Sequence, residues 1–150
     1  MKPILQRKAV YIGIIVVVGL FTPMVVVHEF GHAIVCIEDG FSYTMNFNIL
    51  EAGIHCNGTP KNLLLYFAMG GVLAMIVLLS PFIAFKWITR HRGLVIGLLT
   101  LATHHGVNAI LETFWHVWYV NNIKDSGTIL GFVLGLSFLA YMFLFAKVRR

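Results

Sequence analysis

The sequence predicts an all-α integral membrane protein with about four transmembrane helices and a small membrane-associated β-hairpin after the first helix. Hydrophobic residues make up 59% of the 150 residues and charged residues only 11%, whereas a soluble domain carries about 25% charged residues. Long uncharged apolar runs recur along the chain, and basic residues lie at their ends. The length suits a single domain that covers residues 1–150.

The first transmembrane span is expected at about 9–39. Residues 9–27 carry no charge, and the helical pattern continues to Gly40, a residue type that often ends helices. Pro23 predicts a kink one turn before His28. The start is basic, as in a signal sequence, but the apolar run is longer than the core of a cleaved signal. We therefore interpret this segment as an uncleaved first span.

A β-hairpin is expected at 41–56. Aromatic or apolar residues alternate with Ser, Thr and Asn from Phe41 to Ile49, which is the period of a strand. We expect a turn at Glu51-Ala52-Gly53, a short return strand to Cys56, and an aromatic face at the membrane interface. A disulfide between Cys36 and Cys56 is an option if both residues face an oxidising space.

Three further spans are expected at about 62–85, 93–119 and 126–146. The first of these contains Gly70-Gly71, and small residues allow helices to approach closely. The N-terminus, the loop at 86–92 and the C-terminus carry basic residues and no acidic ones. Because cytoplasmic loops are enriched in Lys and Arg, we expect a multi-pass protein of the plasma membrane with both termini in the cytoplasm.

The sequence His28-Glu29-Phe30-Gly31-His32 carries the clearest chemical signal. On a helix, its two histidines lie on one face, one turn apart. Two neutral imidazoles placed in this way can share one Zn²⁺ ion, and Glu29 can accept a proton from the attacking water. Two core histidines with a surface glutamate would be the simpler reading. Polar groups are costly inside a bilayer, however, and are usually functional there.

Catalytic zinc usually has three protein ligands, so a third is needed besides His28 and His32. Asp125 lies at the start of the fourth span and could bind zinc or cap the helix. Glu112 is the main alternative ligand. The other candidates are His104, His105, His116 and Cys36.

A polar stripe runs along the third span, where Asn108, Glu112 and His116 recur every four residues. This stripe should face the interior of the bundle and not the lipid. It could fix helix packing, support the zinc ligands or admit water. Asn108 is also a candidate to stabilise the oxyanion of a hydrolytic reaction.

The HEFGH sequence within an apolar helix resembles the site-2 protease family of intramembrane metalloproteases. That family takes its third ligand from an Asp-Gly motif at the start of a later transmembrane helix. The segment Asp125-Ser126-Gly127 is similar to this motif, with a serine inserted. The segment 69–74 resembles the family's Gly-Pro segment, with Val72 in place of proline. The resemblance implies that His28, His32 and Asp125 bind the zinc ion.

The predicted function is therefore that of an intramembrane zinc metalloprotease, with a transmembrane protein substrate and the lipid bilayer as partners. An extended substrate could add as a strand to the hairpin at 41–56. A non-proteolytic metal-binding membrane protein and a metal or proton transporter are the alternatives. Nucleic acid is not expected as a partner, because the net charge of +5 is explained by basic residues that flank the spans.

Overall fold

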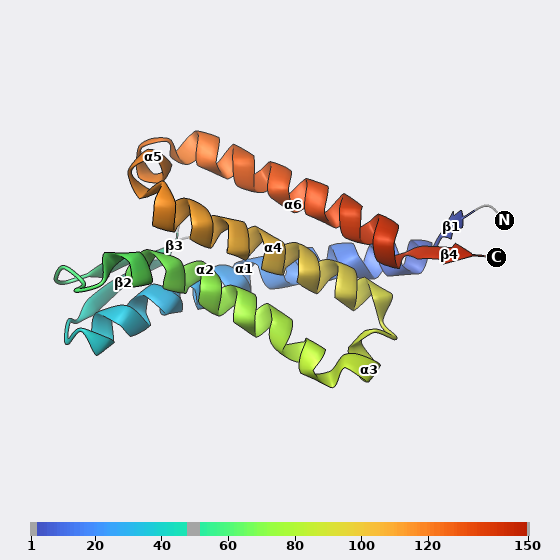
Figure 1. Cartoon of the computed structure of the whole chain (residues 1–150), viewed down its shortest axis with the longest axis horizontal. Coiled ribbons are helices and arrows are strands. Elements are labelled where there is room, and N and C mark those ends of the chain that lie inside the picture. Colours follow the sequence, from blue (N-terminus) through green and yellow to red (C-terminus); the bar gives the residue numbers. More distant parts are fainter. Residues whose placement is uncertain (1–2, 48–51, 150) are drawn as a thin grey trace.

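Four long helices form the body of the protein in the computed structural model, which describes residues 3–47 and 52–149 (Figure 1). They are α1 (Arg7–Glu38), α2 (Leu63–Leu79), α4 (Arg92–Phe114) and α6 (Ile123–Phe145). The 3₁₀ turn η1 (Ser80–Ala84) and α3 (Phe85–Ile88) connect α2 with α4, and α5 (His116–Asn121) connects α4 with α6. Among the described residues, four helical segments are long and apolar enough to cross a membrane: Arg7–Glu38, Leu63–Ala84, Arg92–Phe114 and Ser126–Phe145. The predicted all-α membrane class is confirmed.

The central helix is α4, which packs against α1, α2 and α6. In its most apolar stretch 61% of the residues are buried, against 11% in α1 and 6% in α6. The main apolar core consists of Met24, Leu78, Ile88, Val95, Leu98, Leu101 and Ala102. Because α4 is enclosed by the other helices, its polar residues meet protein instead of lipid, as intramembrane polar groups generally do.

Glycines bring α2 close to both α1 and α4. A Cβ atom added to Gly31 on α1 would lie 2.7 Å from the Cα atom of Gly70 on α2. A Cβ atom added to Gly71 would lie 2.7 Å from the Cβ atom of Ala109 on α4 and would also collide with the carbonyl of His105. The expectation that Gly70-Gly71 permits close helix contact is thus confirmed.

The predicted hairpin is present as β2 (Tyr43–Phe47) and β3 (Ala52–Cys56), which pair in antiparallel fashion. Ala52 and Gly53 belong to β3 and not to the predicted turn, while Glu51 lies outside the described residues. A disulfide joins Cys36 on α1 to Cys56 at the end of β3, with Cα atoms 5.8 Å apart. This bond anchors β3 against the C-terminal part of α1.

The two ends of the described chain lie side by side, at the end of the bundle opposite to the hairpin (Figure 1). There β1 (Pro3–Leu5) pairs with β4 (Lys147–Arg149) in antiparallel fashion. We did not predict these strands from the sequence. Their pairing places both ends of the described chain on one side, as an even number of membrane crossings requires.

The helix boundaries differ from the predicted spans where the backbone leaves the α-helical region. The third span does not reach residue 119, because Trp115 (φ −126°, ψ 30°) separates α4 from α5. His116 therefore does not continue the polar stripe on the same helix. The regular part of the second span ends at Leu79, before Pro81, since proline lacks the N–H that would continue the helix. In contrast, α1 continues through Pro23.

Replacing Gly71 by alanine should destabilise the bundle, because the added methyl group has no space between α2 and α4. Overpacking of this kind costs about 1–3 kcal/mol. The measurement is thermal unfolding of the purified protein in detergent. Gly135→Ala in α6 is the control, since nothing lies within 4 Å of a Cβ atom there. Equal stability of the two variants would contradict the described packing.

Candidate metal centre

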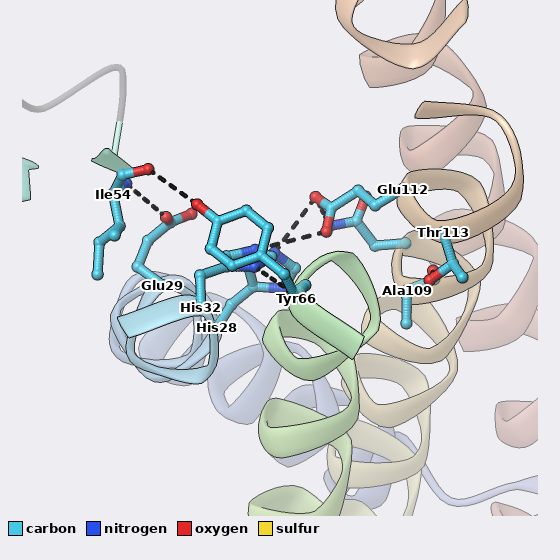
Figure 2. A network of polar contacts seen from close by, with 9 residues as sticks. His28, Glu29, His32, Ile54, Tyr66, Ala109, Glu112 and Thr113 are labelled. Carbon is cyan, nitrogen blue, oxygen red and sulfur yellow. Dashed lines mark hydrogen bonds and ion pairs between the residues drawn. The ribbon is translucent and has the colours of Figure 1, made fainter. Parts of the chain in front are cut away.

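His28 and His32 lie one turn apart on the same face of α1, as the spacing predicted. Both residues are buried, with 5% and 8% of their surface exposed. Their Nε2 atoms are 3.3 Å apart and point toward the space between α1, α2 and α4 (Figure 2). Two imidazoles from one helix thus present their ring nitrogens to a common point.

The proton position on His32 follows from its contact with α2. Its Nδ1–H donates a hydrogen bond of 2.7 Å to the main-chain carbonyl of Tyr66. A carbonyl can only accept, so the neutral ring carries its proton on Nδ1 and leaves the lone pair of Nε2 free. Metal-binding histidines commonly use their second nitrogen in this way.

A carboxylate from α4 completes the group. Glu112 places Oε1 3.3 Å from His28 Nε2 and Oε2 3.6 Å from His32 Nε2. Asn108, one turn earlier on α4, donates a hydrogen bond of 3.0 Å from Nδ2 to Oε1 of Glu112. The ligand atoms of His28, His32 and Glu112 all lie within 4.8 Å of one another, so these residues could hold a metal ion.

The distances and the chemistry of these three side chains both fit a metal ion. Bonds of about 2.1 Å at tetrahedral angles separate neighbouring ligand atoms by about 3.4 Å, and the closest pairs here measure 3.3, 3.3 and 3.6 Å. The Glu112 carboxylate and the free lone pair on Nε2 of His32 are acceptors, and Oε2 of Glu112 has no hydrogen-bond partner among the described residues. A buried carboxylate is stable when it is paired with a positive charge or coordinates a metal, and a metal ion between these three side chains would satisfy it.

The backbone of α2 closes one side of this group at Gly70. A Cβ atom there would lie 2.7 Å from Nε2 of His28 and still closer to Nε2 of His32. Glycine at this position therefore leaves both ring nitrogens free. The sequence predicts close helix packing at Gly70 and places it in the segment that resembles the family's Gly-Pro segment, whereas its position beside the ring nitrogens depends on how α1 and α2 meet.

Tyr119 on α5 lies near the Glu112 side of the centre. Burial raises the pKa of its phenol to about 12, and the Glu112 carboxylate contributes in the same direction. A hydrogen bond with the side chain of Asn108 offsets part of this rise in the pKa. The phenol is therefore protonated at neutral pH and serves as a neutral neighbour of the site.

Glu29 lies beside the group of three ligands and is not part of it. The side chain is half-buried and points away from Glu112, toward the hairpin (Figure 2). Its Oε2 accepts a hydrogen bond of 2.9 Å from the main-chain N–H of Ile54 in β3. The carboxylate thus stands next to the two histidines, between α1 and the edge of β3.

The remaining predicted site residues have other surroundings. The ring of His116 stacks on that of Phe67, with a centroid distance of 3.7 Å, and His116 does not belong to the group of three ligands. Asp125 lies in the first turn of α6, and its side chain is outside the described residues. Its role as third ligand stays a prediction, whereas Glu112, the alternative, lies against both histidines.

Two further histidines of α4 lie on the other side of His28. The ring of His105 is 5.7 Å from that of His28, centroid to centroid, and the ring of His104 is 5.2 Å from that of His105. His104 also contacts the carbonyl of Leu130 through Nδ1, at 3.3 Å. Neither nitrogen of His105 has a hydrogen-bond partner among the described residues.

Fold and site together define a multi-pass membrane protein with a buried group of two histidines and one carboxylate that could hold a metal ion. Comparison with protein-family models, curated proteins and solved structures gives no match for this chain.

Replacing Gly70 by alanine should weaken metal binding, since the methyl group would press against both ring nitrogens. We expect a loss of affinity of about 10–100-fold, comparable to the loss of a group that orients a ligand. Metal affinity is measured by competition with a chromogenic chelator. Gly106→Ala in α4 is the matched control, because its Cβ atom would meet only the sulfur atom of Met75, at 3.2 Å. Unchanged affinity in Gly70→Ala would contradict the described site.

Proposed function

We propose that the protein is an intramembrane zinc metalloprotease that cleaves peptide bonds within transmembrane segments of other proteins. The observation that carries the proposal is the convergence of His28, His32 and Glu112 with a further carboxylate, Glu29, beside them. A site that only binds metal has no need of this second carboxylate. The arrangement is in keeping with the resemblance of the HEFGH sequence to the site-2 protease family.

Two imidazoles and one carboxylate are a donor set of catalytic zinc sites, in which a fourth position is left for water or substrate. Zinc bound here would lower the pKa of a water molecule and polarise the scissile carbonyl. We propose Glu112 as the third ligand on the basis of its distances to the histidines. Asp125 is the competing candidate, from the resemblance.

Glu29 would act as the general base and then as the general acid. Its carboxylate would accept a proton from the attacking water and deliver it to the nitrogen of the leaving amine. The half-buried position beside the histidines supports this role. A helical segment must unwind before its backbone can be reached, so we expect the substrate to bind as an extended strand. The neighbouring hairpin supports this expectation.

We also propose that both termini lie in the cytoplasm and that the protein resides in the plasma membrane. The basic residues near the termini support this orientation. The disulfide between Cys36 and Cys56 ties α1 to the hairpin, which lies at the end of the bundle opposite to the termini (Figure 1), and disulfides persist in oxidising compartments. Site and hairpin would then lie toward the non-cytoplasmic face.

A metal or proton transporter is the second candidate, and the histidines of α4 favour it. His105 and His104 extend the row of imidazoles from His28 deeper into the bundle. Transporters place such polar groups along the path of the transported ion. This function would require the metal to move past His28, whereas a protease would retain it. A metal-binding protein without hydrolytic activity is the remaining alternative.

Glu29→Gln should abolish proteolysis and leave zinc binding intact, because the residue is not a ligand. General acid–base groups contribute about 10²–10⁴-fold to the rate. Cleavage of a transmembrane model substrate in proteoliposomes and the zinc content are measured together. Glu38→Gln, an exposed position on the same helix, is the control and should cleave normally. Cleavage by Glu29→Gln at the rate of the wild type would refute the proposed mechanism, and metal flux without cleavage would favour the transporter.

A further inference from the structure

A peptide segment of the protein itself already lies against Glu29. The N–H of Ile54 donates to Oε2 of Glu29 at 2.9 Å, and the carbonyl of Ile54 accepts from the phenol of Tyr66 at 3.4 Å. Figure 2 shows both contacts on Ile54. The two backbone groups of one residue in a strand point to the same side. Glu29 and Tyr66 together therefore bind one edge of an extended peptide.

This is the edge of β3 that does not pair with β2. Ile54 lies opposite Met45 in the register of the hairpin. Since its N–H and carbonyl are both directed at Glu29 and Tyr66, they are turned away from the partner strand. The site thus presents one acceptor and one donor to the backbone of a strand.

Tyr66 is held in a fixed position relative to the metal centre. Its own main-chain carbonyl accepts the hydrogen bond from Nδ1 of His32 at 2.7 Å. Its ring packs against the imidazole of His32, with a centroid distance of 4.9 Å. The half-buried side chain directs its hydroxyl toward the same side as Glu29 (Figure 2).

We propose that Tyr66 is a catalytic residue, whose phenol donates a hydrogen bond to the carbonyl oxygen of the scissile peptide. This inference rests on the proposed protease function. A substrate strand that made the same two contacts as Ile54 would meet Glu29 at an N–H and Tyr66 at a carbonyl. As negative charge develops on that oxygen, the fixed donor stabilises it.

In the proposed reaction, Tyr66 acts only as a hydrogen-bond donor and transfers no proton. The water oxygen bonds to the carbonyl carbon, and its proton passes to Glu29. The carbon–nitrogen bond then breaks, and Glu29 gives this proton to the amine nitrogen. Tyr66 keeps its own proton throughout and contributes only the hydrogen bond to the carbonyl oxygen.

The same contacts explain why Asn108 is the weaker candidate for this role. Its Nδ2 donates to Glu112 at 3.0 Å, so its amide is used to hold a metal ligand. The sequence pattern singled out Asn108 because it belongs to the stripe on α4. Tyr66 lies in the first turns of α2. No repeat in the sequence indicates that it lies beside His32.

The test is Tyr66→Phe, which keeps the ring against His32 and the main-chain carbonyl but removes the donor. We expect kcat for a transmembrane model substrate to fall by about 10²–10³-fold, with KM nearly unchanged and the zinc content equal to that of the wild type. A phosphinic peptide that mimics the tetrahedral state should lose affinity by a similar factor. Tyr11→Phe, at an exposed position on α1, is the control and should behave as the wild type.

The outcomes separate this inference from the function on which it rests. If the wild type cleaves, Glu29→Gln does not, and Tyr66→Phe cleaves at the rate of the wild type, only the role of Tyr66 is overturned. Loss of zinc in Tyr66→Phe would mean that the residue serves to hold His32 in place. That result would also overturn the catalytic role of Tyr66. A zinc-loaded wild type that cleaves no peptide bond would overturn the protease proposal itself.

Discussion

The contact of Glu112 on α4 with His28 and His32 on α1 is the constraint on which the rest of the structure depends. A carboxylate and two imidazoles enclosed between membrane-spanning helices are costly unless their charges and hydrogen bonds are balanced. α4 must therefore be the enclosed helix, and α2 must approach close enough to seal the site. The glycines at 70 and 71 permit this approach, and a metal ion would supply the missing positive charge.

The site divides its tasks between two sides. On one side, Asn108 orients the carboxylate that faces the histidines. On the other side, Glu29 and Tyr66 meet the backbone of β3, and the disulfide of Cys56 holds this strand near α1. Glu112, the carboxylate that faces the histidines, is thus separate from Glu29, the carboxylate that faces the backbone of β3. This separation is in keeping with the proposed hydrolytic function, because the carboxylate proposed to transfer protons is then not a metal ligand.

Local patterns predicted the parts of the fold that depend on neighbouring residues in the sequence. The spacing of His28 and His32 placed both on one helix face, uncharged runs located the spans, and alternation located the hairpin. The choice between Glu112 and Asp125 could not be made in this way, because it depends on which helices meet. Periodicity places Glu112 on the polar side of its helix but does not give its distance from α1.

Other features had no local signal at all. The carbonyl and the phenol of Tyr66 make their contacts with His32 and Ile54 only when α2 packs beside α1 and β3. The break at Trp115, which removes His116 from the stripe, interrupts an apolar run that reads as one helix. The pairing of β1 with β4 joins segments at opposite ends of the sequence. Each of these features is set by tertiary contact and not by residue spacing.

The central claim is that Glu112 completes the metal site, and metal affinity in two matched variants tests it most directly. Glu112→Gln and Asp125→Asn each remove one carboxylate charge with almost no change in shape. We predict that Glu112→Gln loses more than about 100-fold in zinc affinity, since a direct ligand matters more than an outer partner, and that Asp125→Asn binds zinc as the wild type does. The reverse result, with zinc lost only from Asp125→Asn, would contradict the claim and assign the third ligand to α6.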